Sequence, residues 1–208
     1  MEKIYSYQNN HFYHTYWEER EQAFRQSLLF PKSTYSPWLQ DKAFMEIYNA
    51  IKGNTLVDIY RCYELWSISN RLQKKGAAII EVGVWRGGTA ALLAKANNNH
   101  STIYLCDTFE GVAKAGEKDN HYKGGEHADT SVEIVESLLS AQGISNYKIL
   151  QGIFPDVNAD KIEQEQFKIC HIDVDVYESA KDIFNWVWPR MVVGGVVVFD
   201  DYGFAACA

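Results

Sequence analysis

The sequence lacks the features that mark a membrane protein or a nucleic-acid-binding protein. It contains no run of about 18 apolar residues and no signal peptide at its start, so we expect a cytoplasmic protein without a membrane partner. Lysine and arginine number 20 against 27 acidic residues, and the formal net charge of −7 argues against a nucleic-acid partner, which would need a basic face. The 208 residues, 47% of them hydrophobic, are enough for a domain with a sizeable core.

Two common site signatures are also missing. The four cysteines (Cys62, Cys106, Cys170 and Cys207) have no metal-site spacing. Cys106 and Cys170 lie inside apolar strand patterns, where a buried, reduced thiol is the usual state. The dinucleotide fingerprint G-x-G-x-x-G is absent from the first strand-to-helix turn, which disfavours an NAD-dependent dehydrogenase.

The first quarter of the chain has an irregular helical pattern that is rich in aromatic residues. Apolar positions recur at helical spacing in residues 17–29 and 44–51, and Pro31 and Pro37 interrupt the pattern between them. We expect residues 1–53 to form an N-terminal helical lid or cap. Its aromatic side chains either cover the core or offer stacking surfaces to a ring-shaped substrate. A further helix is predicted over residues 56–73.

From Gly76 onward, apolar segments of strand length alternate with helical patterns. Strands are predicted at residues 77–83, 102–107, 147–151, 167–174 and 192–199. Helices are predicted at residues 89–96, from a capping box at Thr130-Ser-Val-Glu133 to Gly143, and at residues 177–188. This alternation predicts an α/β domain over residues 54–208, with a doubly wound parallel sheet.

Residues 110–128 form a polar, glycine-bearing segment without periodicity. A connection of this length is often a functional lid or a disordered segment. It follows the second predicted strand, so we expect it to hang over the carboxyl edge of the sheet, where ligands of such folds bind.

A glycine-rich turn, Glu81-Val-Gly-Val-Trp-Arg-Gly-Gly88, follows the first predicted strand. Glycines let the backbone approach a ligand closely, and the next helix offers free N–H groups. The order Glu-x-Gly-x-x-x-Gly is common in methyltransferases that use S-adenosylmethionine (SAM). Asp107 ends the second strand, where an acid can accept hydrogen bonds from both ribose hydroxyls of an adenosine. Alternatively, Asp107 anchors a loop or caps a helix.

Two successive strands end in pairs of carboxylates. Asp173 and Asp175 lie two positions apart and therefore share a strand face, and Asp200 and Asp201 end the next strand. Four acids at neighbouring strand ends repel one another unless a cation lies among them. Oxygen ligands suit a hard cation such as Mg²⁺, Mn²⁺ or Ca²⁺. The alternatives are a solvated acidic rim and a helix cap formed by Asp175.

A cation beside SAM would have a chemical use. It can hold two neighbouring hydroxyls of an acceptor and lower the pKa of the one to be methylated. A carboxylate that does not bind the cation can then remove the proton as a general base. His171 shares the strand face of Asp173 and Asp175, and we interpret it as a hydrogen-bonded core histidine rather than a base or ligand.

Four segments resemble, as a set, one known family. They are Val82-Gly-Val-Trp-Arg-Gly-Gly88, Asp107-Thr-Phe-Glu-Gly111, His171-Ile-Asp-Val-Asp-Val-Tyr-Glu-Ser179 and Asp200-Asp-Tyr202. The set resembles the macrocin O-methyltransferase-like family (TylF/MycF/NovP) of SAM- and Mg²⁺-dependent sugar O-methyltransferases, over roughly residues 54–208. The resemblance implies a class I SAM-methyltransferase fold, which is Rossmann-like.

Residue roles follow from the resemblance by matching motif positions. Metal-ligand positions are taken by Asp173, Asp200 and Asp201, and the position of the proposed general base by Asp175. Cofactor-contacting positions are taken by Glu81, Gly83, Arg86, Gly87, Thr89, Asp107, Ser131, Ile153 and Asp173, and Thr55 matches a further one.

The sequence departs from the family pattern in three places. The N-terminal 50 residues match the family's lid poorly, and Gly152-Ile-Phe-Pro155 lacks the aromatic residue that usually precedes the phenylalanine. The sequence stops at Ala208, whereas the methyltransferase fold normally adds a helix and two strands after the fifth strand. We therefore expect either further C-terminal sequence or an edge strand covered by a partner subunit of a homo-oligomer.

The leading hypothesis is a SAM- and divalent-metal-dependent O-methyltransferase. Its expected partner is a small-molecule or glycoside acceptor, methylated on a sugar hydroxyl of a glycosylated metabolite or a polysaccharide. One alternative is a methyltransferase or a hydroxylase-like enzyme acting on a catechol or another non-sugar acceptor. Another is a non-catalytic SAM-binding domain, although a structural role gives no reason to gather four acids.

Overall fold

The computed structural model describes residues 4–7, 10–13, 36–73, 76–119 and 121–202. The chain forms two compact units, residues 1–37 and residues 38–208. In the first, β1 (Ile4–Tyr7) and β2 (Asn10–Tyr13) pair antiparallel, where the sequence pattern predicted irregular helix. The helix predicted over residues 17–29 lies outside the described residues.

The second unit contains a five-stranded parallel sheet with the order β5-β4-β3-β6-β7. Each strand lies within two residues of its predicted bounds at either end. The strands are β3 (Ala78–Val82), β4 (Ile103–Asp107), β5 (Tyr147–Gln151), β6 (Phe167–Ile172) and β7 (Met191–Phe199).

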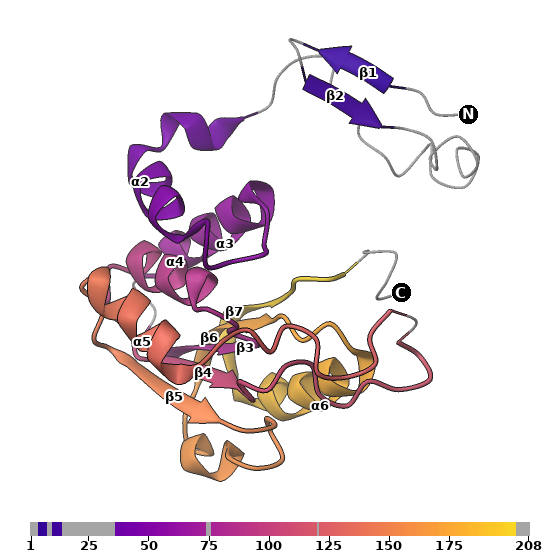
Figure 1. Ribbon diagram of the computed structural model, residues 1–208. Coiled ribbons are helices and arrows are strands. Elements are labelled where there is room, and N and C mark those ends of the chain that lie inside the picture. Colours follow the sequence, from indigo (N-terminus) through magenta and orange to yellow (C-terminus); the bar gives the residue numbers. More distant parts are fainter. Residues whose placement is uncertain (1–3, 8–9, 14–35, 74–75, 120, 203–208) are drawn as a thin grey trace. The chain divides into compact units, whose positions relative to one another are not determined.

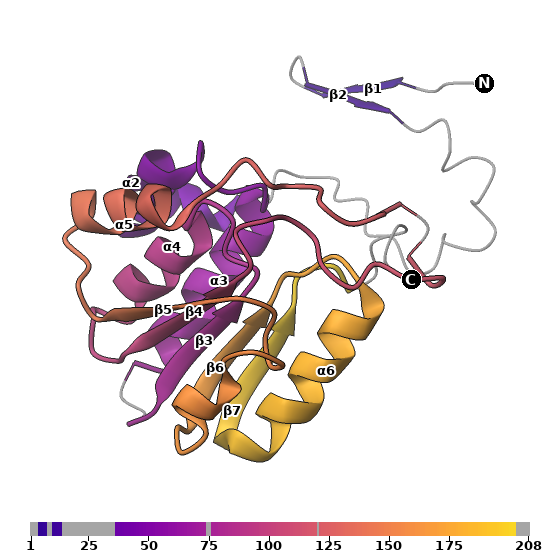
Figure 2. The ribbon, with the colours of Figure 1, turned by 60° about the horizontal axis from the view of Figure 1, so that its bottom comes forward.

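Helices cover both faces of this sheet, as Figures 1 and 2 show. One face carries α2 (Lys42–Ile51), α3 (Ile59–Arg71), α4 (Gly88–Ala96) and α5 (Val132–Ala141). The other carries α6 (Tyr177–Val187) and the short 3₁₀ helix η2 (Ala159–Ile162). Two more 3₁₀ helices are η1 (Pro37–Gln40) and η3 (Trp188–Arg190).

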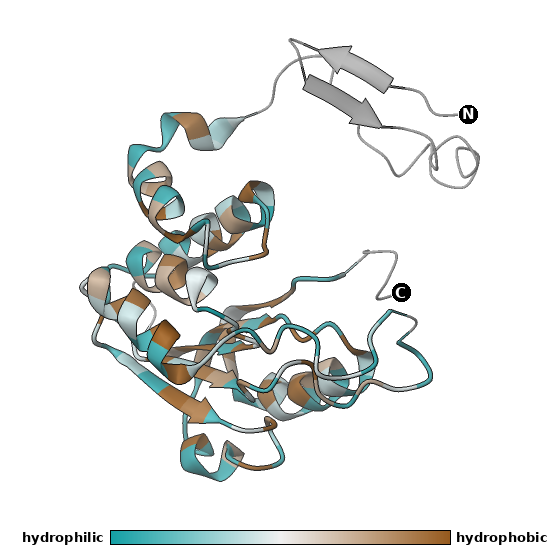
Figure 3. Ribbon diagram, viewed as in Figure 1, coloured by the Kyte–Doolittle hydropathy of each residue, from teal (hydrophilic) through white to brown (hydrophobic). Residues whose placement is uncertain are grey.

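Strand alternation divides the interior into two hydrophobic cores. Ile79 and Leu105 point into the core under α2 to α5, whereas Ile80 and Tyr104 point into the core under α6. Figure 3 shows hydrophobic residues along the central strands, as expected for strands buried on both faces. Helix α2, predicted to belong to the lid, packs in the first core through Phe44 and belongs to the second unit.

Polar side chains start the helices at positions close to those predicted. Asp41 caps α2, because its Oδ1 accepts from the N–H of Phe44 at 3.0 Å. The capping box predicted from Thr130 is wrong by one residue. Ser131 is the N-cap of α5, and its hydroxyl accepts from the N–H of Ile134 at 3.3 Å. The hydroxyl of Thr130 instead donates to the carbonyl of Trp85.

Strands β3 and β6 are neighbours, and from this pair the strand order runs in opposite directions along the sheet. Such a topological switch point leaves a crevice at the carboxyl ends of the strands. Gly83 leaves β3 there with a φ of +87°, and a Cβ on it would lie 1.6 Å from the carbonyl oxygen of Asp173. Only glycine fits this contact, which brings the glycine-rich turn and the first acid pair together.

The described residues include no helix long and apolar enough to cross a membrane. Cys106 and Cys170 are buried, unpaired thiols, as their strand patterns predicted. The last strand, β7, is an outer strand of the sheet, and its Val193 side chain is 96% exposed.

Candidate active site

A cleft of about 350 Å³ opens at the carboxyl ends of the strands, at the switch point. Its volume suits a small-molecule site. Most of the predicted site residues line it: Thr55, Gly83, Thr89, Asp107, Ile153, Asp173, Asp175, Asp200 and Asp201. Four predicted cofactor-contacting residues, Glu81, Arg86, Gly87 and Ser131, do not.

Asp107 holds the glycine-rich turn in place. One carboxylate oxygen, Oδ2, accepts from the N–H groups of Val84 at 2.6 Å and Trp85 at 2.8 Å. The other, Oδ1, accepts from the N–H of Phe109 at 2.7 Å. This is the anchoring role given above as the alternative. A carboxylate has about four acceptor positions, so these bonds leave room for a ribose hydroxyl, and that role stays a prediction.

Arg86, Gly87 and Ser131 lie on the outer side of the turn. Arg86 donates to the backbone carbonyl of Asp129 at 2.8 Å and to its carboxylate at 2.7 Å. Gly87, with a φ of +83°, is the N-cap of α4 and packs against Val135 of α5. These contacts tie the turn to the start of α5, and the predicted contacts of the three residues with a cofactor stay predictions.

The acids at the ends of β6 and β7 lie close to His171. One ligand atom each from His171, Asp173 and Asp200 lies within 4.8 Å of the others. Burial and the charge of Asp200 raise the pKa of Asp173 well above its ordinary value. Burial, Asp175 and Asp200 raise the pKa of Asp201 to about 6. The charged forms of these two acids are therefore disfavoured, and a divalent cation among them would compensate the burial and the repulsion.

His171 is fully buried and paired with Glu81. Its Nδ1 lies 2.8 Å from Glu81 Oε1, and its Nε2 lies 3.5 Å from Asp200 Oδ1, within ion-pair distance but long for a hydrogen bond. Burial alone would lower the pKa of His171, but the two carboxylates outweigh it and raise this pKa to about 10. The expected hydrogen-bonded core histidine is therefore observed, and Glu81 points toward it.

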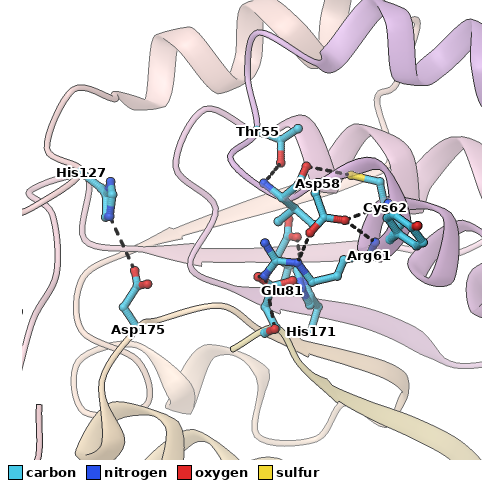
Figure 4. A network of polar contacts seen from close by, with 11 residues as sticks. Thr55, Asp58, Arg61, Cys62, Glu81, His127, His171 and Asp175 are labelled. Atoms are coloured by element: carbon cyan, nitrogen blue, oxygen red, sulfur yellow. Dashed lines mark hydrogen bonds and ion pairs between the residues drawn. The ribbon is translucent and has the colours of Figure 1, made fainter. Parts of the chain in front are cut away.

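Arg61 and His127 line the cleft, although no sequence pattern selected them. Arg61, from α3, contacts the carboxylate of Asp200. His127 Nε2 lies 4.0 Å from Asp175 Oδ2, and the two side chains face each other in Figure 4. The helical period of α3 marks its apolar face only, and His127 falls in the segment without a pattern.

The long segment after β4 is fixed to α6 at several points. The ammonium group of Lys114 lies 2.8 Å from the carboxylate of Asp156 and 2.9 Å from that of Asp182. Asp119 Oδ1 accepts from the N–H of Tyr177 at 2.9 Å, at the start of α6. The alternative in which Asp175 caps this helix is therefore wrong. Asp175 instead has a φ of +63°, an uncommon backbone conformation for a residue other than glycine.

The fold and the position of the cleft define a class of protein. A parallel sheet with a glycine-rich turn after β3 and a cleft at the switch point is the class I methyltransferase fold. Two solved structures share it. The O-methyltransferase NovP aligns with a TM-score of 0.57 and 23% identity, over 71% of this chain and 66% of that one. The calicheamicin methyltransferase CalS11 aligns with a TM-score of 0.62 and 15% identity, over 82% and 80%.

The family follows from sequence comparison. The model of the macrocin O-methyltransferase (TylF) family matches residues 51–208, and the chain belongs to this family. A demethyldecarbamoylnovobiocin O-methyltransferase of Streptomyces niveus is 30% identical to this chain. The match covers 60% of this chain and 52% of the relative. A mycinamicin III 3''-O-methyltransferase of Micromonospora griseorubida is 28% identical over 62% and 56%. The chain spans about half the length of the curated relatives it matches.

Proposed function

We propose that this protein is a SAM-dependent O-methyltransferase that uses a divalent cation to methylate a sugar hydroxyl of a glycosylated small molecule or a polysaccharide. The observation that carries the proposal is one cleft with a glycine-rich turn on one side and four carboxylates on the other. Family membership supports methyl transfer. A sugar acceptor is supported by a relative whose name specifies a rhamnosyl tetracenomycin 4'-O-methyltransferase.

The turn side of the cleft fits SAM. Gly83 and the buried Thr89 at the start of α4 bring the backbone to the cleft. Asp107 keeps the turn in this conformation and retains acceptor capacity for hydroxyl donors. When bound, SAM supplies an electrophilic methyl group, and the turn fixes its direction of transfer.

The acid side fits a hard cation. The four carboxyl groups of the cleft and the closely spaced ligand atoms match the oxygen-rich sites that Mg²⁺ and Mn²⁺ prefer. Asp173, Asp200 and Asp201 would hold the cation, which when bound lowers the pKa of an acceptor hydroxyl. His171 neutralises part of the charge that remains.

Asp175 is the proposed general base. Its left-handed backbone sets its carboxylate in the cleft beside His127, two residues beyond Asp173. It would take the proton of the acceptor hydroxyl, and the oxygen would receive the methyl group as the methyl–sulfur bond of SAM breaks. The leaving group would be the neutral thioether S-adenosylhomocysteine.

The direct test measures methyl transfer from labelled SAM to a panel of free sugars, glycosides and catechols. Transfer to a glycoside that stops with EDTA and returns with Mg²⁺ or Mn²⁺ is the expected result. Asp175→Asn should lower kcat by about 100-fold or more, because general bases contribute about 10²–10⁴. Turnover of catechols alone would reject the sugar acceptor, and unchanged turnover in EDTA would remove the cation.

A further inference from the structure

Five charged side chains of alternating sign contact one another in a row that passes through the acid cluster at Asp200. In order they are Asp58, Arg61, Asp200, His171 and Glu81. The first two belong to the start of α3, Asp200 follows β7, His171 lies in β6 and Glu81 lies in β3. Figure 4 shows Asp58, Arg61, His171 and Glu81 close together. Each acid has a basic neighbour, and Asp200 has one on either side.

Arg61 is held from its own helix. Asp58 is the N-cap of α3, where its Oδ1 accepts from the N–H groups of Tyr60 and Arg61. Its second oxygen, Oδ2, accepts from Arg61 Nε at 2.8 Å. The guanidinium is thereby oriented before it contacts anything across the cleft. This leaves Nη1 to reach Asp200.

Arg61 Nη1 contacts Asp200 at two points, the carboxylate oxygen Oδ2 and the backbone carbonyl at 3.3 Å. On the other side, His171 Nε2 faces Oδ1. The Asp200 side chain is only 5% exposed, so water does not compete strongly for these contacts. Both oxygens of one proposed ligand are thus fixed before any cation arrives. Partners that orient a ligand typically raise metal affinity by about 10–100-fold.

The positive charge of Arg61 repels a cation, so this repulsion must be compared with the gain from orienting Asp200. The Arg61 side chain is 40% exposed, and water screens its charge. Asp173, Asp175 and Asp201 also line the cleft and offer carboxylate oxygens to a cation. Orientation of Asp200 therefore outweighs repulsion.

We propose that Arg61 is a positioning residue of the cation site, which orients the ligand Asp200 from helix α3. The proposal rests on the cation of the proposed function. A lysine would not replace Arg61, because one ammonium group cannot bond to Asp58 and to two oxygens of Asp200 in the fixed directions of a guanidinium.

The test is direct binding of Mn²⁺ to the full chain, measured by electron paramagnetic resonance and calorimetry without SAM or acceptor. Arg61→Gln should weaken Mn²⁺ binding by about 10–100-fold. Arg61→Lys should recover little of this loss. Asp58→Asn, which keeps a helix-capping side chain, should cause a smaller loss in the same direction. The matched control is Arg71→Gln, an exposed arginine in the last turn of the same helix.

Thermal unfolding separates positioning from a general structural role. If Arg61 served only stability, Arg61→Gln would lower Tm and leave the Mn²⁺ affinity of the folded protein unchanged, which would overturn the proposal. Tighter Mn²⁺ binding in Arg61→Gln would also overturn it, because Arg61 would then act as a competitor. Absence of Mn²⁺ binding in the wild type would instead reject the cation of the proposed function, and Arg61's role with it.

Discussion

The two sides of the cleft are stabilised in different ways. On the turn side, the Asp107 carboxylate is satisfied by three backbone N–H groups, so the conformation is complete without a ligand. On the acid side, Asp173 and Asp201 face other carboxylates, and their pKa values are raised through burial and this repulsion. The turn is therefore preformed, whereas the acid side depends on charge supplied from outside. Both sides meet at Gly83.

Gly83→Ala should have the largest effect, because it disturbs both sides at once. The new Cβ would clash with the carbonyl of Asp173, and residue 83 would also be held at a positive φ. We expect a loss of about 4 kcal/mol or more in the free energy of unfolding, measured in urea.

Gly143→Ala is the matched control, because its φ is +66° but no atom lies within 4 Å of the added Cβ. It should cost only about 1–2 kcal/mol. Equal losses of unfolding free energy in the two variants would show that backbone strain, and not the contact with Asp173, causes the destabilisation.

The acid side should respond to cations and pH. The pKa of Asp201 is raised from 3.8 to about 6, so the folded state holds its proton more tightly than the unfolded chain does. Its contribution to stability therefore falls as pH rises from about 4 to about 6 and is level above that range. At about pH 8, a cation at about 100 times its dissociation constant should add about 2.7 kcal/mol. At about pH 5 the gain should be smaller, because protons compete for the ligands.

Urea unfolding with and without Mn²⁺ at the two pH values measures this response. Asp201→Asn should reduce the decline in stability between about pH 4 and pH 6, since the titrating group is gone. An equal Mn²⁺ effect at both pH values would contradict an acid side that lacks charge compensation.

The turn side should be sensitive to its anchor and indifferent to cations. Asp107→Asn turns one acceptor oxygen into a donor that faces a backbone N–H, and should cost about 2 kcal/mol. Glu110→Gln, an exposed acid-to-amide change in the following segment, is the control and should cost less than about 0.5 kcal/mol. Mn²⁺ affinity should stay at the wild-type value in both variants. A large drop in that affinity for Asp107→Asn would mean that the two sides are not separable.

The smallest effect is expected at the segment after β4. Lys114→Gln removes two ion pairs with partly exposed partners and should cost about 0.5–1 kcal/mol. Hydrogen exchange of residues 112–119 should increase with it. Lys123→Gln changes an exposed lysine of the same segment, and should leave exchange unchanged. Equal exchange in both variants would show that Lys114 does not hold this segment.

The sheet could be predicted from the sequence mainly because its three central strands, β3, β4 and β6, are buried on both faces. Such strands give continuous apolar runs, and each one ends in a glycine or an acid that marks the carboxyl edge. Asp173 lies at the end of one predicted strand and Asp200 directly after the next, so their proximity could be inferred as soon as those strands were taken as neighbours. The short strands β1 and β2 were missed because four residues give too little periodicity for a pattern to register.

Contacts across the cleft were not predictable in the same way. The reach of Arg61 to Asp200 joins residues 139 positions apart and depends on where α3 packs. The pairing of Glu81 with His171 depends on the register of β3 against β6, which places these two residues side by side. The anchoring of Lys114 and Asp119 on α6 comes from single polar contacts, which leave no periodic trace in a sequence.

The contact between Gly83 and Asp173 sets the distance between the two binding sites of the proposed enzyme. With no side chain between the two backbones, the separation of the methyl donor and the cation is set by the packing of β3 against β6 alone. The segment after β4 and helix α3 border the cleft without entering this contact. A chimera that receives the segment between β4 and α5 from a relative should therefore exchange acceptors while keeping the same transfer distance.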